Sequence, residues 1–270
     1  MEKMTKTYRV PAQVSISKQE IIMKFSFSTP VPEVLYQDED ILVVIKPAGM
    51  PSLPDKLGFM DLQTFLQASF GQSKAAPDTS IRLIHKLDRP VGGVTIFSRS
   101  ETTDKWFDSE IPDRKIQKTY QAIVCGTMPD RQGELIDYLV KSEKTSRARV
   151  VPKEKKGARR AALGYEVLRT GNVEGFGDIS LLKLTLFTGR HHQIRVQLSN
   201  AGCPIFGDGK YNKQFSTAKN KGWYKLALFS SEIFFLHPRT GKEMTFRADP
   251  FEKEPLAFST FFPEAPKIKE

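Results

Sequence analysis

The order of apolar and polar positions along the chain predicts a protein built mainly from short strands. Residues 41–45 form a continuous apolar run that ends at a Lys-Pro pair, which is typical of a buried strand. Along 179–187, leucine occupies every second position from 182 to 186, so one face of this strand should be apolar. Further strand-like runs are expected at 119–124, 161–168, 226–229, 233–236 and 244–247.

Helical spacing is restricted to a few segments. Apolar residues over 59–70 recur every three or four positions, and Ser100 can cap a helix that runs to about 110. Residues 191–201 are expected to form a helix that stops at Gly202. Because strands outnumber helices and do not alternate regularly with them, we predict an α+β fold with a mixed, mostly antiparallel sheet flanked by helices and loops.

Composition limits the class of protein. The chain has 270 residues, 39% of them hydrophobic and 27% charged, which suits one globular domain. No run approaches the roughly 18 apolar residues of a membrane helix, and residues 1–6 contain no apolar signal segment. The two cysteines, Cys125 and Cys203, lack metal-site spacing. We expect a cytoplasmic protein without membrane association, and no glycine-rich motif indicates a nucleotide cofactor.

The charge pattern indicates a nucleic-acid partner. The net charge is +10, and residues 141–160 carry nine Lys or Arg but only two Glu, a local charge of +7. We predict a mobile loop or extended hairpin, the basic arm, that contacts RNA phosphates through Lys153, Lys155, Lys156, Arg159 and Arg160. The alternative for this segment is an ordinary solvated loop.

One acidic residue stands among cations in a turn rich in Gly and Pro. Asp88 lies between Lys86 and Arg89, and a β-rich run follows. A carboxylate enclosed by positive charge is expected to stay ionised, which suits a nucleophile or an electrostatic stabiliser. The alternative is a surface turn in which the Asp caps backbone amides.

A second cluster of charge joins a strand end to a helix start. Arg190, His191 and His192 gather where the helix macrodipole disfavours cations, so a docked carboxylate or phosphate would balance them. Asp88 is the internal candidate. Zinc-binding helices use histidines four residues apart rather than adjacent ones, so we expect no metal here. Tyr120 opens a strand, as a core aromatic or as a platform for a base.

These segments together resemble the RluA-type pseudouridine synthase family, over roughly residues 33–250. That family isomerises uridine in rRNA or tRNA without a cofactor or metal. The blocks that carry the resemblance are, in order, KPAGM (46–50), HKLDR (85–89), KTY (118–120), GRHHQIR (189–195), GCPIFGD (202–208) and HPRTG (237–241).

The resemblance assigns roles to individual residues. Asp88 would be the catalytic residue, Tyr120 would lie under the target base, and Arg190 would pair with Asp88 and keep it charged. Leu228 would pack against the base. Lys86, Arg89, His192 and Arg195 would bind RNA in addition to the basic arm.

The resemblance also implies a mechanism. The uridine leaves the stack, its glycosidic bond breaks, and the base rotates and rejoins through C5. Asp88 would attack the ribose or the uracil ring, or remove a ribose proton.

The chain departs from the family pattern at three places. Lys86 replaces an Arg that helps to fill the gap left by the flipped nucleotide, Val91-Gly92 replace Thr-Ser, and Phe229 replaces a His. The first change implies that extrusion of the nucleotide is handled differently here.

The expected domain organisation is simple. Residues 1–30 would be an extension too short for an S4 RNA-binding domain, residues 31–255 the catalytic domain around a central cleft, and residues 256–270 a C-terminal tail. We expect a monomer whose partner is RNA. The alternatives are a non-catalytic RNA-binding or RNA-chaperone relative of the same fold, and a glycosylase or nuclease that would release uracil or break the strand.

Overall fold

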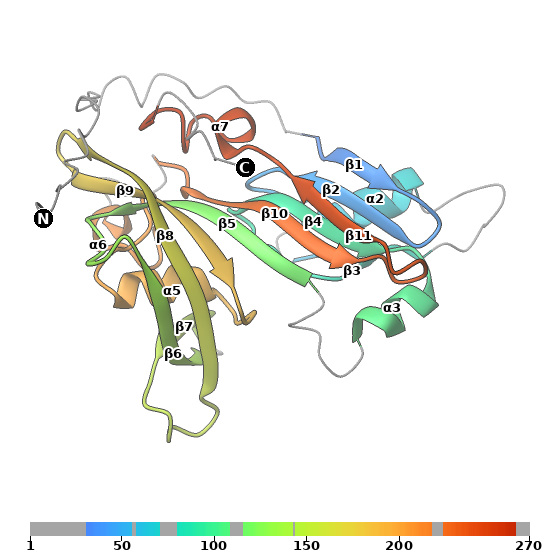
Figure 1. Ribbon diagram of the computed structural model, residues 1–270, viewed down its shortest axis with the longest axis horizontal. Helices are drawn as coiled ribbons and strands as arrows, with labels where there is room; N and C mark the ends of the chain where they lie inside the picture. Colours follow the sequence, from blue (N-terminus) through green and yellow to red (C-terminus); the bar gives the residue numbers. More distant parts are fainter. Residues whose placement is uncertain are drawn as a thin grey trace, which may run out of the picture.

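Eleven strands of the described chain form one sheet (Figure 1). The computed structural model describes residues 31–262 except 56–57, 71–79, 109–115, 143 and 218–223. The strands are β1 (Glu33–Gln37), β2 (Ile41–Lys46), β3 (Arg82–Leu83), β4 (Gly92–Ser98), β5 (Ile116–Cys125), β6 (Gln132–Ser142), β7 (Arg147–Val150), β8 (Arg159–Val173), β9 (Gly177–Leu186), β10 (Leu228–Leu236) and β11 (Glu243–Arg247).

The sheet is mixed and mostly antiparallel, as the sequence predicts. Its order is β1-β2-β4-β10-β5-β9-β8-β6-β7, with β11 beside β10 and β3 beside β4. The pairing of β10 with β4 is parallel, while the other named strand pairs are antiparallel.

Helices are short and lie on the faces of the sheet. They are α2 (Leu62–Phe70), α3 (Glu101–Asp108), α5 (Gln193–Asn200), α6 (Lys213–Ser216) and α7 (Pro250–Lys253). Within the described part of the chain, none of them has the length and apolar character that crossing a membrane requires.

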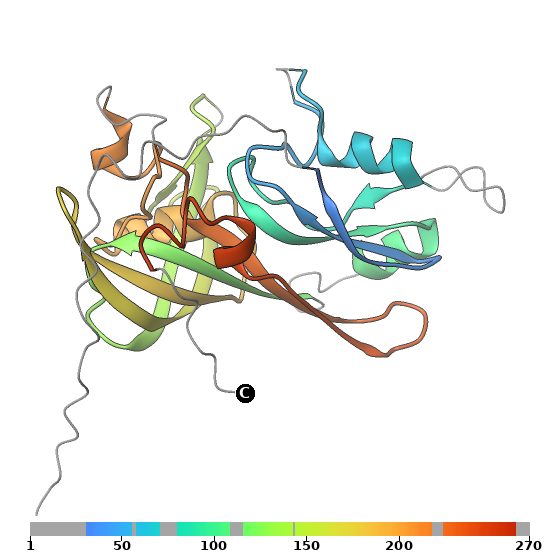
Figure 2. The same cartoon turned by 90° about the horizontal axis from the view of Figure 1, so that it is seen from above.

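The elements form two lobes (Figures 1 and 2). β1 to β4, α2 and α3 lie in one lobe, and β6 to β9 with α5 and α6 lie in the other. β10 and β5 run through the middle, because β10 pairs with β4 on one side and β5 on the other. β6, β7 and β8 project from the second lobe at the lower left of Figure 1 and carry the basic arm.

The first lobe buries β2 on both faces, which explains its continuous apolar run. Leu42 and Val44 pack with Leu62 and Leu66 of α2. Val43, on the opposite face, lies in a second cluster with residues of β4, α3 and β10. Every residue of β2 is therefore buried.

In the second lobe, α5 contacts β6 and β7. Three polar side chains of α5, those of Gln193, Arg195 and Gln197, are buried. Most of their polar atoms form hydrogen bonds within the described chain: Gln197, for example, donates to the Leu135 carbonyl at 3.1 Å and to Asp137 at 2.8 Å, although its buried Oε1 has no partner there. The helix is held by these polar contacts and also by Ile194, Val196 and Leu198, which are buried in the core clusters.

Several element boundaries differ from the sequence predictions. The run 233–236 and the last two residues of the run 226–229 belong to one strand, β10, whose pairing with β5 shifts register between Ser230 and Glu232. α2 begins at Leu62 rather than 59, and α5 at Gln193 rather than 191. Ser100 does cap α3, because its Oγ accepts the Thr103 amide at 3.2 Å. The predicted helix ends at 71 and 110 lie outside the described residues.

The C-terminal boundary is wrong in the sequence prediction. Phe258, Phe261 and Phe262 are at most 5% exposed and belong to the main core, so residues 256–262 are packed rather than a tail. Their aromatic side chains stabilise the fold in the way any core residue does. Residues 1–30 and 263–270 lie outside the described chain.

Candidate functional site

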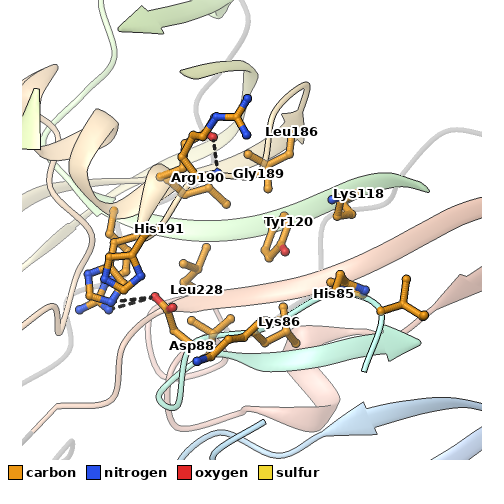
Figure 3. Close-up of a pocket in the computed structure, with 17 residues that line it drawn as sticks. His85, Lys86, Asp88, Lys118, Tyr120, Leu186, Gly189, Arg190, His191 and Leu228 are labelled. Atoms are coloured by element: carbon orange, nitrogen blue, oxygen red, sulfur yellow. Dashed lines mark hydrogen bonds and ion pairs between the residues drawn. The ribbon is translucent and has the colours of Figure 1, made fainter. Parts of the chain in front are cut away.

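A cavity of about 350 Å³ lies where the two lobes meet (Figure 3). Residues 84–88 and 91 line it from the first lobe, and Tyr120 of β5 and Leu228 of β10 form its middle. Residues 189–195 close it from the second lobe. The cavity thus brings together residues of three of the sequence blocks, HKLDR, KTY and GRHHQIR, and its volume suits a small organic group.

Lys46 holds the turn that carries Asp88. Its side chain is fully buried, and Nζ donates to the carbonyls of Pro47, Met50 and Arg89 at 3.0, 2.8 and 3.2 Å. Burial lowers the pKa of Lys46 to about 7, while the charges of Glu254 and Asp88 act in the opposite direction. The Lys-Pro end of β2 therefore fixes the backbone next to Asp88.

Arg195 is the ion partner of Asp88. Its Nη1 lies 3.2 Å from Asp88 Oδ2, while Nε and Nη2 form a two-pronged contact with Asp208, both at 2.8 Å. The Arg195 side chain is 5% exposed and that of Asp208 is fully buried. Such a fork-to-fork pair fixes the guanidinium in one orientation.

The prediction that Arg190 pairs with Asp88 is wrong. Arg190 Nε donates to the carbonyl of Arg160 at 3.1 Å, and Figure 3 shows its guanidinium directed away from Asp88. The reason is the helix start: Arg190 precedes His192, whose φ of 53° turns the chain, and therefore faces the arm. Arg195 lies inside α5 and faces Asp88.

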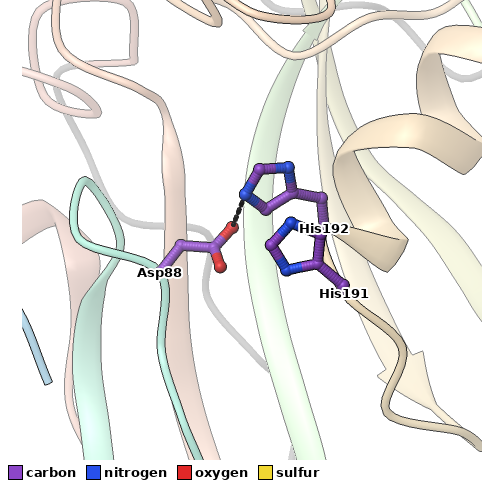
Figure 4. Close-up of side chains that lie close together, drawn as sticks. All are labelled: Asp88, His191 and His192. Carbon is purple, nitrogen blue, oxygen red and sulfur yellow. Dashed lines mark ion pairs between the residues drawn. The ribbon is translucent and has the colours of Figure 1, made fainter. Parts of the chain in front are cut away.

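The two histidines lie beside the Asp88 carboxylate (Figure 4). His192 Nε2 is 3.5 Å from Asp88 Oδ2, and the His191 ring stacks on the His192 ring with centroids 3.8 Å apart. Burial lowers the pKa of His192 to about 3; the Asp88 charge opposes this shift, while Arg195, His191 and Lys210 add to it. His192 is therefore neutral at physiological pH. Asp88 does lie at this helix start, but the charged group it pairs with there is Arg195 rather than Arg190 or the neutral His192.

Tyr120 and Leu228 form the apolar middle of the cavity. They are 6% and 4% exposed, and Figure 3 shows both between Asp88 and His85. The pKa of Tyr120 is raised, mainly by burial and further by the Asp88 charge, against a hydrogen bond with Ser230. The phenol stays protonated, so it offers a neutral aromatic surface rather than a base. Tyr120 is thus both a core residue and part of the cavity wall.

The far end of the cavity holds two residues that the sequence analysis did not single out, His85 and Lys118. Burial, followed by the charge of Lys118, lowers the pKa of His85 to about 3, so its imidazole is neutral. Because these residues belong to the HKLDR and KTY blocks, respectively, the sequence could have indicated that they lie at the site.

The predicted RNA-binding cations fall into two groups. Lys86 and Arg89 border a neighbouring cavity of about 650 Å³, which also reaches Asp88 and includes Lys210 and Lys225. The five arm residues lie elsewhere, on the turn 151–158 and the start of β8, and all five are exposed: Lys153, Lys155, Lys156, Arg159 and Arg160. The structure does not bring the arm cations to Asp88.

Two of the departures from the family pattern, at Gly92 and Phe229, have local explanations. A Cβ on Gly92 would lie 3.0 Å from Glu254 Oε1, so the side chain of a serine would crowd this glutamate. Phe229 is 1% exposed and packs edge-on against Phe258, which favours an aromatic residue over a histidine. Lys86 is exposed beside Asp88.

Asp88, His191 and His192 place three possible metal ligands within 4.8 Å of one another. One atom of each already has another partner: Arg195 contacts Asp88 Oδ2, Tyr211 contacts His192 Nδ1 at 2.8 Å, and the Ser146 carbonyl contacts His191 Nε2 at 3.1 Å. A guanidinium this close to the carboxylate would repel a cation. This donor set therefore suits an ion-paired carboxylate better than a metal.

Comparison with known families gives a consistent match. The family model described as RNA pseudouridylate synthase matches residues 40–200. The chain is 32% identical to tRNA pseudouridine synthase C of Vibrio parahaemolyticus, over 80% of this chain and 89% of the relative. It is 30% identical to the dual-specificity RNA pseudouridine synthase RluA of Haemophilus influenzae, over 81% of this chain and 93% of the relative.

A further relative and a solved structure agree with this match. The chain is 30% identical to ribosomal large subunit pseudouridine synthase C of Buchnera aphidicola, over 80% of this chain and 66% of the relative. The solved human RNA pseudouridylate synthase domain containing 1 superposes with a TM-score of 0.67 at 20% identity, covering 88% of this chain and 90% of that one. The structural likeness concerns the fold.

Proposed function

The chain belongs to the RNA pseudouridylate synthase family and is an RNA pseudouridine synthase, and we propose that it isomerises uridine in structured rRNA or tRNA with Asp88 as its catalytic carboxylate. The observation that supports this role is the arrangement around Asp88. Arg195 and His192 both approach Oδ2, and among the described residues no hydrogen bond or ion pair involves Oδ1. A charged oxygen without a partner, at the wall of a cavity of nucleobase size, is a suitable reacting atom.

The proposed reaction conserves every atom of the nucleotide. The target uridine flips out of the RNA at a cost of a few kcal/mol and enters the cavity. Ionised Asp88 starts cleavage of the bond between C1′ and N1. The free uracil turns, C5 bonds to C1′, and the C5 proton leaves while N1 gains one. Because water would trap the intermediate, the cavity must stay closed while the base is detached.

The residues around Asp88 have separate proposed roles. Tyr120 lies against the base as a neutral aromatic surface, and Leu228 excludes water beside it. Arg195 pairs with Asp88 Oδ2 and orients the carboxylate, the pairing that the sequence suggested for Arg190. Asp208 in turn holds Arg195 from the other side. These assignments make Asp88, Tyr120 and Arg195 the catalytic set.

RNA binding is proposed along two surfaces. Lys86 and Arg89, together with Lys210 and Lys225, border the cavity of about 650 Å³ that reaches Asp88 and would contact the strand next to the flipped nucleotide. His192 adds a polar edge at the same place. The exposed cations of the basic arm would contact phosphates farther away, where they supply affinity without sequence information.

Asp88→Asn tests the catalytic assignment. The amide has nearly the same shape but no charge and little nucleophilicity, so isomerisation should be abolished while RNA affinity stays within a few-fold. The assay is pseudouridine mapping in RNA from cells with and without the protein, followed by the purified variant on the RNA identified. Activity within tenfold of wild type would refute the role of Asp88, and release of free uracil or strand cleavage would refute the proposed reaction.

Substitution of five residues at once tests the basic arm. Replacing Lys153, Lys155, Lys156, Arg159 and Arg160 by Ser should weaken binding to all RNAs alike. Each phosphate contact contributes about 0.7–0.9 to the slope of log affinity against log salt, so the slope should flatten by a few units. The matched control is Lys105→Ser, which removes an exposed cation from α3. An unchanged slope in a salt titration would show that the arm is a solvated loop.

We further propose a monomer that acts in the cytoplasm, with a catalytic domain extending from about residue 31 to 262. The proposal of a monomer is supported by the site itself, because its residues all come from one chain: Asp88, Tyr120, Arg195 and Leu228. Sedimentation of the purified protein with and without RNA tests the oligomeric state.

A further inference from the structure

We propose that Tyr211 is a positioning residue, which holds His192 as the tautomer with its proton on Nε2 and connects the basic arm to Asp88. The effect on rate rests on the proposed function, whereas the effect on the tautomer does not. Tyr211 follows Asp208 and Lys210 in the segment before α6, and the residue is partly exposed.

Three contacts connect the arm to the carboxylate through Tyr211. The backbone amide of Ala148, in β7, donates to the Tyr211 hydroxyl oxygen at 2.8 Å. The same hydroxyl lies 2.8 Å from His192 Nδ1. On the other side of the ring, His192 Nε2 lies 3.5 Å from Asp88 Oδ2 (Figure 4).

The position of each proton follows from the chemistry of the donors. An amide N–H can only donate, so the Tyr211 oxygen is the acceptor from Ala148. The hydroxyl still has its one proton to give, and His192 Nδ1, 2.8 Å away, is the acceptor within reach. A neutral imidazole carries a single proton, which therefore sits on Nε2 and faces the Asp88 carboxylate.

The surroundings keep His192 neutral. The charged or titratable groups that influence it are Asp88 from the 85–89 turn, Arg195 from α5, the neighbouring His191, and Lys210. Burial and the three basic neighbours disfavour a second ring proton, and only Asp88 favours it. Without that second proton, the hydroxyl of Tyr211 decides which nitrogen is protonated.

A second contact ties the same hairpin to the same place. The Ser146 carbonyl, in the turn between β6 and β7, lies 3.1 Å from His191 Nε2, and the His191 ring stacks on His192. The Tyr211 ring also lies 5.3 Å from the guanidinium carbon of Arg195. Tyr211 thus contacts the arm, His192 and Arg195, so a shift of β7 would reorient the groups that contact Asp88.

A basic cavity lies on the arm side of Tyr211. It has a volume of about 730 Å³, and Lys141, Arg147, Arg149 and Tyr211 are among its lining residues. An RNA phosphate held there would contact the strand that donates to Tyr211. The geometry therefore couples occupancy of the arm to the orientation of Asp88.

The test is Tyr211→Phe, which deletes only the hydroxyl. ¹⁵N-labelled histidine in the RNA-free protein reports the state of each ring nitrogen, because protonated and unprotonated nitrogens have well separated shifts. The signals of His192 are identified by their loss in His192→Gln. Wild type should show His192 with Nδ1 unprotonated and Nε2 protonated, and the variant should show a mixture of tautomers. We expect kcat to fall about tenfold, with the KM for RNA nearly unchanged.

The matched control is Tyr36→Phe in β1, which deletes a hydroxyl that donates to Asp38 Oδ2 at 2.8 Å. It should lose similar stability, with the His192 spectrum and kcat as in wild type. A wild-type His192 protonated on Nδ1, an unchanged spectrum in Tyr211→Phe, or an unchanged kcat would each overturn the proposal. If wild type isomerises no RNA while the spectra change as expected, the proposed function fails and the role of Tyr211 in fixing the tautomer stands.

Discussion

Arg195→Met should distinguish the roles of the two arginines of the GRHHQIR block. The substitution keeps most of the side-chain length but removes the guanidinium, which contacts Asp208 through two nitrogens and Asp88 through the third. The fully buried Asp208 side chain would then lose the cation that forms its ion pair. Removing one partner of a buried ion pair typically costs about 3–5 kcal/mol. We expect a loss of this size in the free energy of unfolding at pH 7.

The loss should depend on pH in a defined direction. Burial alone would raise the pKa of Asp208, but the hydrogen bonds and charge of Arg195, helped by the amides of Lys210 and Tyr211, hold it below its usual value. In wild type this contribution is present above the unfolded pKa of about 3.9 and is lost as pH falls through the folded pKa. Without Arg195, burial favours the protonated acid. The difference between wild type and variant should therefore be largest near neutral pH and shrink below about pH 4.

Urea unfolding of both proteins at a series of pH values measures this difference, and turnover on the RNA substrate measures its catalytic counterpart. Arg190→Ala is the matched control, since it removes a hydrogen bond to a backbone carbonyl and should cost under about 1.5 kcal/mol. Equal losses for the two variants, or a loss in Arg195→Met that does not change with pH, would refute the assignment of Arg195 as the partner of both carboxylates.

Two further substitutions test the backbone around the site. Lys46→Met leaves three carbonyls without their donor and should lower the free energy of unfolding in urea by at least about 1–3 kcal/mol. Because the folded pKa of Lys46, about 7, lies below its unfolded value, the wild type alone should gain stability between pH 7 and 10. A parallel gain in the variant would contradict this. Gly93→Ala should lower the free energy of unfolding by more than about 3 kcal/mol, since its φ is 119° and a Cβ would lie 2.2 Å from the Ser230 carbonyl oxygen. Gly175→Ala, with a φ of 77° and open space around it, should cost only about 1–2 kcal/mol. Equal urea midpoints for the two alanine variants would show that contact with β10 is not the constraint.

The sequence was sufficient for the family, the mixed sheet and the location of the site. Apolar runs marked the buried strands β2 and β5, and the basic 141–160 segment is the extended hairpin that was one of its two predicted forms. β6 escaped notice because its exposed and half-buried residues alternate without a strong apolar face. The split of β10 into two runs has a similar cause, because its polar residues around 230–232 interrupt the apolar pattern while the backbone pairing continues.

Residue roles within the site could not be read from the sequence alone. Arg190 and Arg195 occupy the same block, and the left-handed His192 between them decides which one faces Asp88. Positive φ is uncommon for residues other than glycine, so the sequence does not indicate that His192 adopts it. The part played by Tyr211 also depends on a contact between residues 63 positions apart.

The central place of β10 in the sheet has a consequence for protein synthesis. The lobe that carries Asp88 and the lobe that carries Arg195 are joined edge to edge by a strand that is among the last to leave the ribosome. Until residues 228–236 emerge, β4 and β5 each lack the neighbour that completes their pairing, and Leu228 is missing from the cavity. Until then the core of the first lobe is incomplete as well, because Ile233 and Phe235 of β10 belong to the same cluster as Val43, and the carboxylate and its arginine remain apart. An RNA-modifying enzyme made in this order has its reacting groups aligned only after β10 has followed both lobes from the ribosome.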